Sequence, residues 1–187
     1  MGTTRRSLVT GIAGFTALGA TGAGRFAMAA TPTSDPGADA AAASALHKLV
    51  SENPAAQELN SKAVAALVFP KIVKVGFLLG GAYGEGVLLQ GNKTLGYYES
   101  AAASYGLQAG VQWFGYVLFF MNTGALNYLN SSHGFEIGMG PSVVVVDQGL
   151  AKKFSSTTLT QDVYAFIFNQ NGLMAGLGLE GSKITKV

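Results

Sequence analysis

The chain has 187 residues, a formal net charge of +2 and no cysteine, which excludes a disulfide framework, a thiolate metal site and a lipidated N-terminal cysteine. Charged residues make up only 12% of the chain and hydrophobic residues 49%, and no basic stripe indicates a nucleic-acid partner. We therefore expect one domain that holds together by its core alone.

The first 29 residues have the pattern of a twin-arginine signal peptide. Arg5-Arg6 precedes a mild apolar run over 8–23, too short and weak for a membrane span, and Ala27-Met28-Ala29 offers a signal peptidase site. We predict export of the folded protein, which places the mature chain in the periplasm or elsewhere outside the cytoplasm, peripheral to a membrane. Cleavage removes three arginines and no acidic residue, so nine basic residues face ten acidic ones and the net charge becomes −1.

Two helices are predicted after a flexible linker over residues 30–38. The first is alanine-rich and spans about 39–50, with Leu46 and Leu49 on one side. Asn53-Pro54 then reads as an N-cap followed by proline at the first helical position, and it starts a second helix that we expect to reach about residue 67. Residues 39–187 are expected to form one domain.

Beyond Pro70 the composition changes to glycine, valine, phenylalanine, tyrosine and leucine, which predicts strands. A helical crossing is expected at Thr123–Asn130, and a polar loop at Gln148–Thr160. The predicted strands span 72–82, 85–91, 94–103, 106–112, 114–121, 134–139, 142–147, 162–170, 173–179 and 182–187.

Short links between consecutive strands favour an antiparallel arrangement. Turns are predicted at Gln90–Lys93 and at Asn169–Gly172, since Asn-Gly tolerates the positive φ of tight hairpins. Gly115–Met121 is apolar on both faces, so it should be a central strand covered on both sides. The predicted fold is α+β, with N-terminal helices packed on a strongly curved, mostly antiparallel, glycine-rich sheet or partial barrel.

The sequence offers little chemistry. Gly80-Gly81-Ala82-Tyr83-Gly84-Glu85-Gly86 lacks both the Gly-Lys-Ser/Thr ending of a phosphate loop and the spacing of a dinucleotide fold. His133 could be combined with Glu136, Asp147 and a nearby serine, but no serine sits on a strand-to-helix elbow. We therefore expect no catalytic residue, no metal, no cofactor and no enzymatic activity.

Acidic residues within the apolar strands are the other candidates for function. Glu85 and Glu180 are possible buried acids, and Lys71 and Lys74 are their candidate partners, because an unpaired buried carboxylate is costly. The alternative is that these glutamates, with Glu99, face solvent on the outer side of the sheet.

Several motifs together resemble the SYLF family of lipid-binding domains, over about Ala63 to Ile184. Two departures are Asn169-Gln170-Asn171, where relatives often carry a basic residue, and Gly96-Tyr97-Tyr98-Glu99, where many have a Gly-Pro-Trp run. The matching pieces are Phe69-Pro70-Lys71, Lys74-Val75-Gly76-Phe77, Gly80 to Leu88, Tyr105 to Gln112, Phe119 to Asn122 with Ala125-Leu126, Gly140-Pro141, Gly172 to Gly176 and Leu179 to Ser182. The resemblance implies lipid or membrane association without an established catalytic activity.

The resulting hypothesis is a non-enzymatic domain that binds phospholipids in the cell envelope. An apolar helix face would contact lipid, and a lysine-bearing edge would contact headgroups. The alternatives are a structural protein that docks on an envelope protein, and a carrier that holds an apolar ligand inside the curved sheet. The oligomeric state stays open. The candidate lipid-binding residues are Lys71, Lys74, Phe69, Leu46, Leu49 and Trp113.

Overall fold

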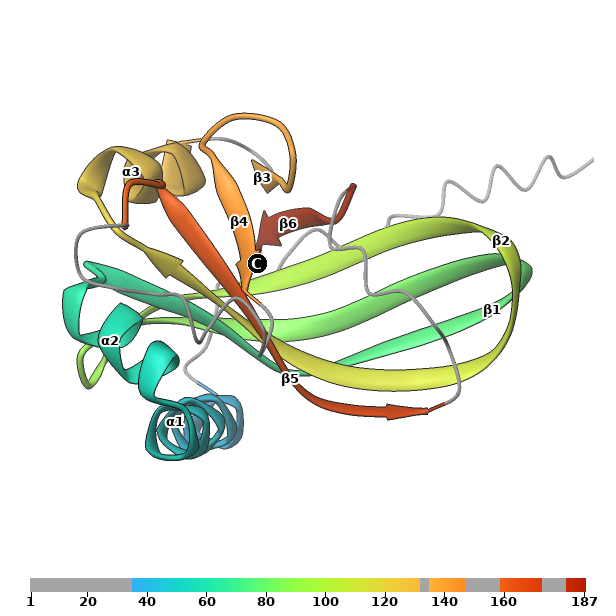
Figure 1. The fold of residues 1–187 in the computed structure, drawn as a ribbon, viewed down its shortest axis with the longest axis horizontal. Helices are drawn as coiled ribbons and strands as arrows, with labels where there is room; N and C mark the ends of the chain where they lie inside the picture. The colour runs from blue at the N-terminus through green and yellow to red at the C-terminus, as the bar shows by residue number, and fades with distance from the viewer. Residues whose placement is uncertain (1–34, 132–134, 147–158, 173–180) are drawn as a thin grey trace, which may run out of the picture.

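The computed structural model describes residues 35–131, 135–146, 159–172 and 181–187. Within these ranges the chain forms three helices and one six-stranded sheet (Figure 1). The elements are α1 (Pro36–Glu52), α2 (Pro54–Lys62), β1 (Ala65–Gln90), β2 (Lys93–Phe120), α3 (Thr123–Ser131), β3 (Phe135–Glu136), β4 (Val143–Val146), β5 (Val163–Gly172) and β6 (Lys183–Lys186).

A long antiparallel ribbon of β1 and β2 is the framework of the molecule. The two strands pair from Ala65↔Phe120 to Gln90↔Lys93 around a two-residue turn, where Gly91 adopts a φ of 58°. The other edge of β2 carries β6 at one end and β5 at the other, and the order β3-β6-β2-β5-β4 follows. Only the β4–β5 pair is parallel among the described strands. The predicted α+β fold with a curved, mostly antiparallel sheet is confirmed.

The ribbon folds back on itself, and glycines allow the close approach. A Cβ atom added to Gly84 would lie 2.5 Å from the Lys71 carbonyl oxygen, and one added to Gly86 would lie 2.6 Å from the Phe69 ring. The second half of β1 therefore packs directly against its first half. At the bend, the pairing shifts register after Gly76↔Gly110, and Gly110 has a φ of 143°, which side chains disfavour.

The sheet separates two clusters of buried side chains. The inner face of the fold is filled by aromatic residues of β1 and β2 and is closed at one end by α3, which contributes Ala125, Leu126 and Leu129. The outer face is covered by α1 and α2 through Ala42, Leu49, Ala55, Ala56 and Leu59. In Figure 1 all three helices gather at one end, and β1 and β2 extend beyond them.

Both α1 and α2 are capped at their N-termini, and two long-range hydrogen bonds also hold α1 in place. The side chains of Asp35 and Asn53 accept hydrogen bonds from the first backbone amides of α1 and α2 respectively. In the first turn of α1, Asp39 Oδ1 accepts from Thr94 Oγ1 and from the Tyr97 hydroxyl, both at 3.0 Å. These contacts fix the start of α1 on β2.

Some boundaries differ from the sequence-based expectations. The helix predicted over 54–67 ends at Lys62, because Ala65 already pairs with Phe120 of β2. The five strands predicted between 72 and 121 are only two, since glycines bend the ribbon without ending it. The first helix begins at Pro36 instead of Asp39.

The predicted turn at Asn169–Gly172 is wrong. β5 runs through it, and Trp113 pairs with Asn171. Asn169 has a φ of 52° where the register shifts, so its tolerance of the left-handed region serves a bulge instead of a hairpin.

Other predictions are confirmed. The turn at Gln90–Lys93 and the helix after Thr123 are present, and the segment from Tyr116 to Phe120 is fully buried between β1 and β5. The predicted signal peptide (1–29) and the strand over 173–179 lie outside the described residues, as does most of the loop over 148–160.

Candidate functional site

An apolar surface emerges where the outer face of the sheet runs beyond the helices. Along β2, Phe119 and Val117 are buried on this face, but Trp113 and Val111 further on are 42% and 51% exposed. We call the four exposed side chains at this end the ribbon patch: Val73, Val75, Val111 and Trp113.

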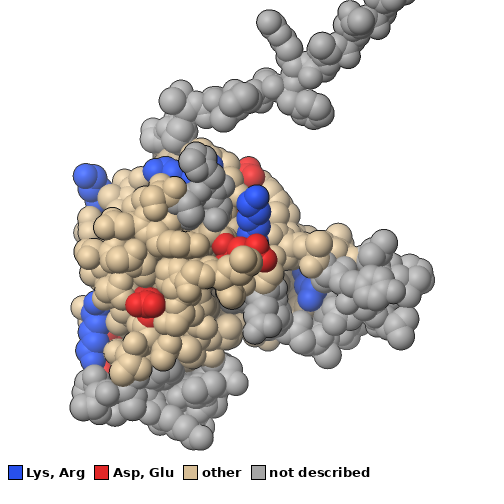
Figure 2. Space-filling view, turned by 90° about the horizontal axis from the view of Figure 1, so that it is seen from above, with Lys and Arg blue, Asp and Glu red and all other residues tan. Residues whose placement is uncertain are grey.

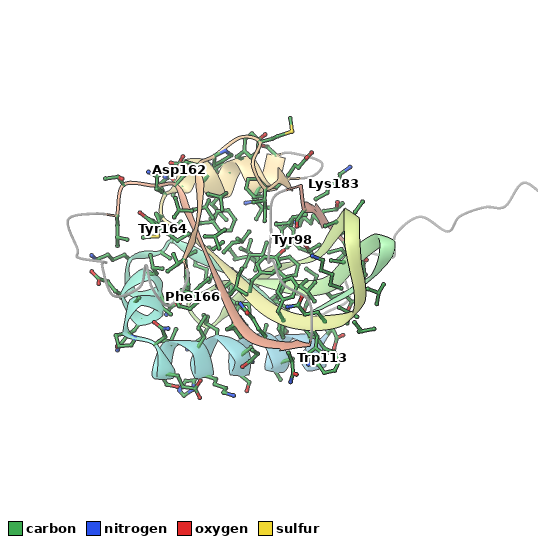
Figure 3. All side chains as sticks on the ribbon, turned by 45° about the vertical axis from the view of Figure 1, so that its right-hand side comes forward. Tyr98, Trp113, Asp162, Tyr164, Phe166 and Lys183 are labelled. Carbon is green, nitrogen blue, oxygen red and sulfur yellow. The ribbon has the colours of Figure 1, made fainter. Side chains whose placement is uncertain are left out.

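The ribbon patch is contiguous because its members are neighbours across the ladder. Val73 is paired with Trp113 and Val75 with Val111, and the two valines of β1 are 38% and 48% exposed. Directly opposed side chains on one face lie close enough to touch. Contiguous exposed apolar surface of this kind marks interaction sites, whereas single exposed apolar residues do not. In Figure 3, Trp113 lies at the margin of the molecule and Tyr98 in its interior.

One cation borders the ribbon patch. The Nζ atom of Lys71 lies 5.9 Å from the centroid of the Trp113 ring, within the range of a cation–π contact. The ammonium group therefore sits beside an aromatic ring that is itself half exposed. Figure 2 shows that charged side chains on the face it presents are scattered over a mostly uncharged surface.

A groove of about 630 Å³ adjoins the ribbon patch: it is lined by Val73 of the patch and by Lys71 at the border of the patch. Its other wall carries Glu85 and Glu99, which are opposed across the β1–β2 ladder, and Tyr83, whose hydroxyl donates to Glu85 Oε1 at 3.5 Å. Desolvation, reinforced by Glu99 and Glu85, raises the pKa of Tyr83 to about 12. The groove thus combines one ammonium group with a carboxylate pair.

The structure brings together only some of the residues expected to bind lipid. Lys71 and Trp113 are adjacent and exposed. Phe69 is fully buried and its ring stacks on Tyr116 at 4.6 Å, so it cannot contact a membrane. Leu49 is buried and Leu46 is half-buried against the sheet. The apolar stripe of α1 covers the core and is not available to lipid.

Two further expectations need correction. Lys74 was expected at the lysine-bearing edge, but it is 9% exposed and points to the inner face. The reason is a register shift between Phe69 and Ile72, which gives β1 an extra residue and reverses the alternation beyond it. Glu85, a possible buried acid, is exposed, and Glu180 lies outside the described residues.

Sequence reasoning missed Val73, Val75 and Val111. The available signal was the alternation along β2, in which 111, 113, 117 and 119 share one face. That signal could show that the face is apolar along its whole length. It could not show where the helices stop covering it.

Two searches over the described residues gave negative results. They contain no group of three or more histidine, aspartate or glutamate side chains placed to hold a metal ion. In the same part of the chain, each helix is too short or too polar to cross a bilayer.

Comparison with known proteins identifies a family. Residues 101–187 match the family model described as Ysc84, Las17-binding protein actin regulator. No curated protein matches the chain. The matched range begins within β2 and includes Val111 and Trp113 of the ribbon patch. The SYLF resemblance predicted from the motifs is thereby confirmed over residues 101–187, which match the Ysc84 (SYLF) family model.

Proposed function

We propose that this protein is a non-enzymatic domain that binds phospholipid membranes peripherally through the ribbon patch. The observation that carries the proposal is the run of four exposed apolar side chains, paired across the ladder, with Lys71 beside Trp113. Tryptophan combines a large apolar body with a polar N–H group, which suits the boundary between headgroups and acyl chains. Family membership is consistent with this role.

The expected affinity is modest. Burying a large apolar side chain completely contributes about 1.5–3 kcal/mol, and each member of the patch is about half covered already, so four of them supply roughly 3–6 kcal/mol. Lys71 adds about 1 kcal/mol near an anionic surface. Reversible association follows, in which apolar insertion dominates and charge has a secondary effect.

This mechanism assigns the membrane contact to the sheet instead of the helices. The apolar faces of α1 and α2 are occupied by the outer face of the sheet. Their role is to hold the covered end of the ribbon rigid. The alternative of a carrier with an apolar ligand inside the sheet finds no support at the covered end of the ribbon. There the side chains of Phe69, Tyr116 and Phe120 fill the inner face.

We place this activity at the cell envelope, since residues 1–29 carry the pattern of a twin-arginine signal. That route exports folded proteins, so the ribbon patch would be formed before the protein reaches its membrane. Phospholipid is the partner that this proposal requires, without nucleic acid and without a cofactor.

Vesicle sedimentation tests the proposal. A Val111→Ser/Trp113→Ser variant should bind neutral and anionic vesicles at least about tenfold more weakly, because about 1.4 kcal/mol corresponds to a factor of ten. Met139→Ser is the matched control, since Met139 is 62% exposed but lies outside the patch. Lys71→Gln should weaken binding to anionic vesicles only.

Two outcomes would contradict the proposal. One is a folded parent chain that stays in the supernatant with both kinds of vesicle. The other is a patch variant that binds as tightly as the Met139→Ser control.

The family description favours a second candidate, in which the ribbon patch docks on a protein. The description names a protein-binding role for the family, and exposed aromatic surface serves protein interfaces as well as membranes. A photoreactive amino acid at position 113 separates the two in intact cells. Docking predicts one dominant protein adduct, whereas membrane binding predicts lipid adducts.

A further inference from the structure

The groove beside the ribbon patch holds a carboxylate pair that the membrane proposal does not use. Its volume of about 630 Å³ lies within the range of small-molecule sites, roughly 300–1,000 Å³. Lys71 and Val73 line it from the first half of β1, and Tyr83 and Glu85 from the second half. Glu99 of β2 adds the second carboxylate. The fold-back of the ribbon therefore brings three stretches of the chain to one hollow surface.

The carboxylate pair carries uncompensated charge. Glu85 and Glu99 are directly opposed across the β1–β2 ladder, where like charges repel each other and destabilise the pairing. The Tyr83 hydroxyl donates to Glu85 Oε1 but brings no charge. Among the described residues the one ion pair joins Lys62 to Glu58, so neither carboxylate of the groove has a cationic partner there. Water satisfies their hydrogen bonds and leaves the repulsion in place, so a bound cation would stabilise this arrangement.

The ammonium group of Lys71 lines the same groove but lies toward the ribbon patch. Its Nζ atom is 5.9 Å from the centroid of the Trp113 ring, so a cation–π contact draws it to that side. A purely anionic ligand would meet the carboxylate pair, and a purely cationic ligand would meet Lys71. A ligand that carries both charges, joined by a short spacer, matches the groove at each end.

The position of the groove favours a membrane lipid as the source of this ligand. Val73 belongs both to the groove and to the ribbon patch. Trp113 is its partner across the ladder and suits the boundary between headgroups and acyl chains. With the patch in a membrane, the groove would lie at the level of the headgroups.

We propose that the groove binds the headgroup of a phospholipid that carries a phosphate and a primary ammonium group, as phosphatidylethanolamine does. The ammonium group would donate to Glu85 and Glu99, and the phosphate would lie toward Lys71. A primary ammonium has three N–H donors, whereas the trimethylammonium group of phosphatidylcholine has none. A serine headgroup adds a carboxylate, which the two glutamates would repel. This inference rests on the proposed function, because it requires the ribbon patch to lie in a membrane.

Vesicle sedimentation with two uncharged compositions tests the headgroup. Phosphatidylcholine alone is the reference, and phosphatidylcholine mixed with phosphatidylethanolamine is the probe. The parent chain should bind the mixed vesicles at least about tenfold more tightly, the factor that a hydrogen bond to a charged group supplies. Glu85→Gln/Glu99→Gln should remove this preference and keep the binding to phosphatidylcholine. The variant should fold, since it relieves a like-charge pair.

Glu52→Gln/Glu136→Gln is the matched control, because it removes two exposed carboxylates that lie outside the groove. It should keep the preference for the mixed vesicles. Any effect of phosphatidylethanolamine on lipid packing acts on both variants alike, so the difference between them reports the groove.

Isothermal titration calorimetry with soluble compounds separates the lipid from other occupants. Glycerophosphoethanolamine carries the headgroup without acyl chains, and Nα-acetyl-lysine amide carries the ammonium group of a basic protein segment without a phosphate. The first should bind more tightly than the second and more weakly than the lipid in vesicles. Tighter binding of the lysine compound would assign the groove to a protein segment, and glycerophosphoethanolamine that binds as tightly as the lipid would assign it to a soluble ligand. Either result overturns the lipid assignment.

Two vesicle results would also overturn the inference: equal binding of the parent chain to both compositions, or a folded groove variant with the preference of the control. The failure of the proposed function is a separate outcome. If the parent binds both compositions equally and Val111→Ser/Trp113→Ser binds both more weakly, the patch is a membrane site and the headgroup inference alone is wrong. If the parent binds neither composition, the proposed function is wrong and the inference fails with it.

Discussion

On the outer face of β2, Val117 and Phe119 lie fully buried in the cluster that α1 and α2 cover, whereas Trp113 and Val111 are about half exposed. The four residues follow one alternation, and their chemistry is alike. What differs is the cover, which ends where the helices end (Figure 1). Gly115 marks the boundary, because the Phe168 ring lies over it, 2.6 Å from where a Cβ atom would be.

This difference shows that an apolar face has two uses in one strand. At the covered end it supplies the free energy of folding. At the uncovered end the same surface stays in water and is available to a partner. Variants of the two ends should therefore separate stability from binding.

The largest expected effect is at the covered end. Phe119→Ala should lower the free energy of unfolding by about 3–5 kcal/mol, because it leaves a cavity in a fully buried site. Trp113→Ala removes a larger ring but should change stability by no more than about 1 kcal/mol. Urea denaturation measures both values. Similar losses in the two variants would show that both ends contribute to the core alike.

The fold-back of the ribbon supports the uncovered end and gives the second prediction. Gly84→Ala should cost about 1–3 kcal/mol, because the added Cβ atom meets the Lys71 carbonyl oxygen at 2.5 Å. Gly81→Ala is the control, since its Cβ atom would be 3.5 Å from the Ala102 carbonyl oxygen, an ordinary contact. Thermal unfolding of the pair measures the difference. Equal melting temperatures would mean that the two halves of β1 are not in close contact.

A third prediction concerns the anchoring of the cover. Asp39→Ala should destabilise the fold by about 1.5–2 kcal/mol, because it removes the acceptor for Thr94 and Tyr97. Glu52→Ala removes the same charge from the exposed end of α1 and should have little effect. Hydrogen exchange should show faster exchange in α1 for the first variant only. Unchanged protection would show that α1 is held by its apolar contacts alone.

At the uncovered end, Tyr83 should respond to alkali. Desolvation and the nearby Glu99 and Glu85 raise its folded-state pKa from 10.0 to about 12. Since the folded value is the higher one, its contribution to stability is complete below pH 10 and is lost as the pH rises through about 12. In Glu99→Gln the phenol should ionise at lower pH, which ultraviolet titration detects. If the titration of Tyr83 were the same in this variant as in the parent protein, Glu99 would not be a cause of the raised pKa.

At the covered end, Asp162 should respond to acid. Hydrogen bonds from Asn122 and from the amide and hydroxyl of Ser142 lower its pKa below the ordinary 3.8. Because the folded value is the lower one, the stabilisation is present above pH 3.8 and is lost as the pH falls through the folded value. Asp162→Asn should flatten this part of the stability profile. If the variant lost stability at low pH as the parent protein does, other carboxylates would be responsible for that loss.

Much of the fold could be predicted because, in several segments, the local preferences of the residues agree with the structure that the whole chain adopts. Gly91-Asn92 has the chemistry of a tight turn, and Asn53-Pro54 has that of a helix start. Gly115–Met121 is apolar on both faces, which required the central position that it occupies. The family could be predicted because the glycine motifs follow one another in the family's order.

The site could be predicted only in part, because one extra residue in a strand reverses the face on which all the following side chains lie. The sequence does not show that β1 gains a residue between Phe69 and Ile72, and this bulge is what leaves Lys71 beside Trp113 and turns Lys74 to the inner face. The same limit applies to Asn169, whose turn chemistry serves a bulge. Lys71 and Trp113 were both named as candidates from the sequence, but their contact comes from the pairing of β1 with β2, which the sequence did not predict.

The two-residue turn between β1 and β2 also bears on how the chain folds. Each further pair along the ribbon closes a loop only slightly larger than the one before, so pairing can zip from Gln90↔Lys93 toward Ala65↔Phe120. β5 and β6 meet β2 across long sequence separations and should join later. We expect Gly91→Ala to slow refolding and Val163→Ala mainly to speed unfolding, as stopped-flow kinetics would show. If Val163→Ala instead slowed refolding and Gly91→Ala mainly sped unfolding, the folding nucleus would include β5, and the pairing of β1 with β2 would follow it.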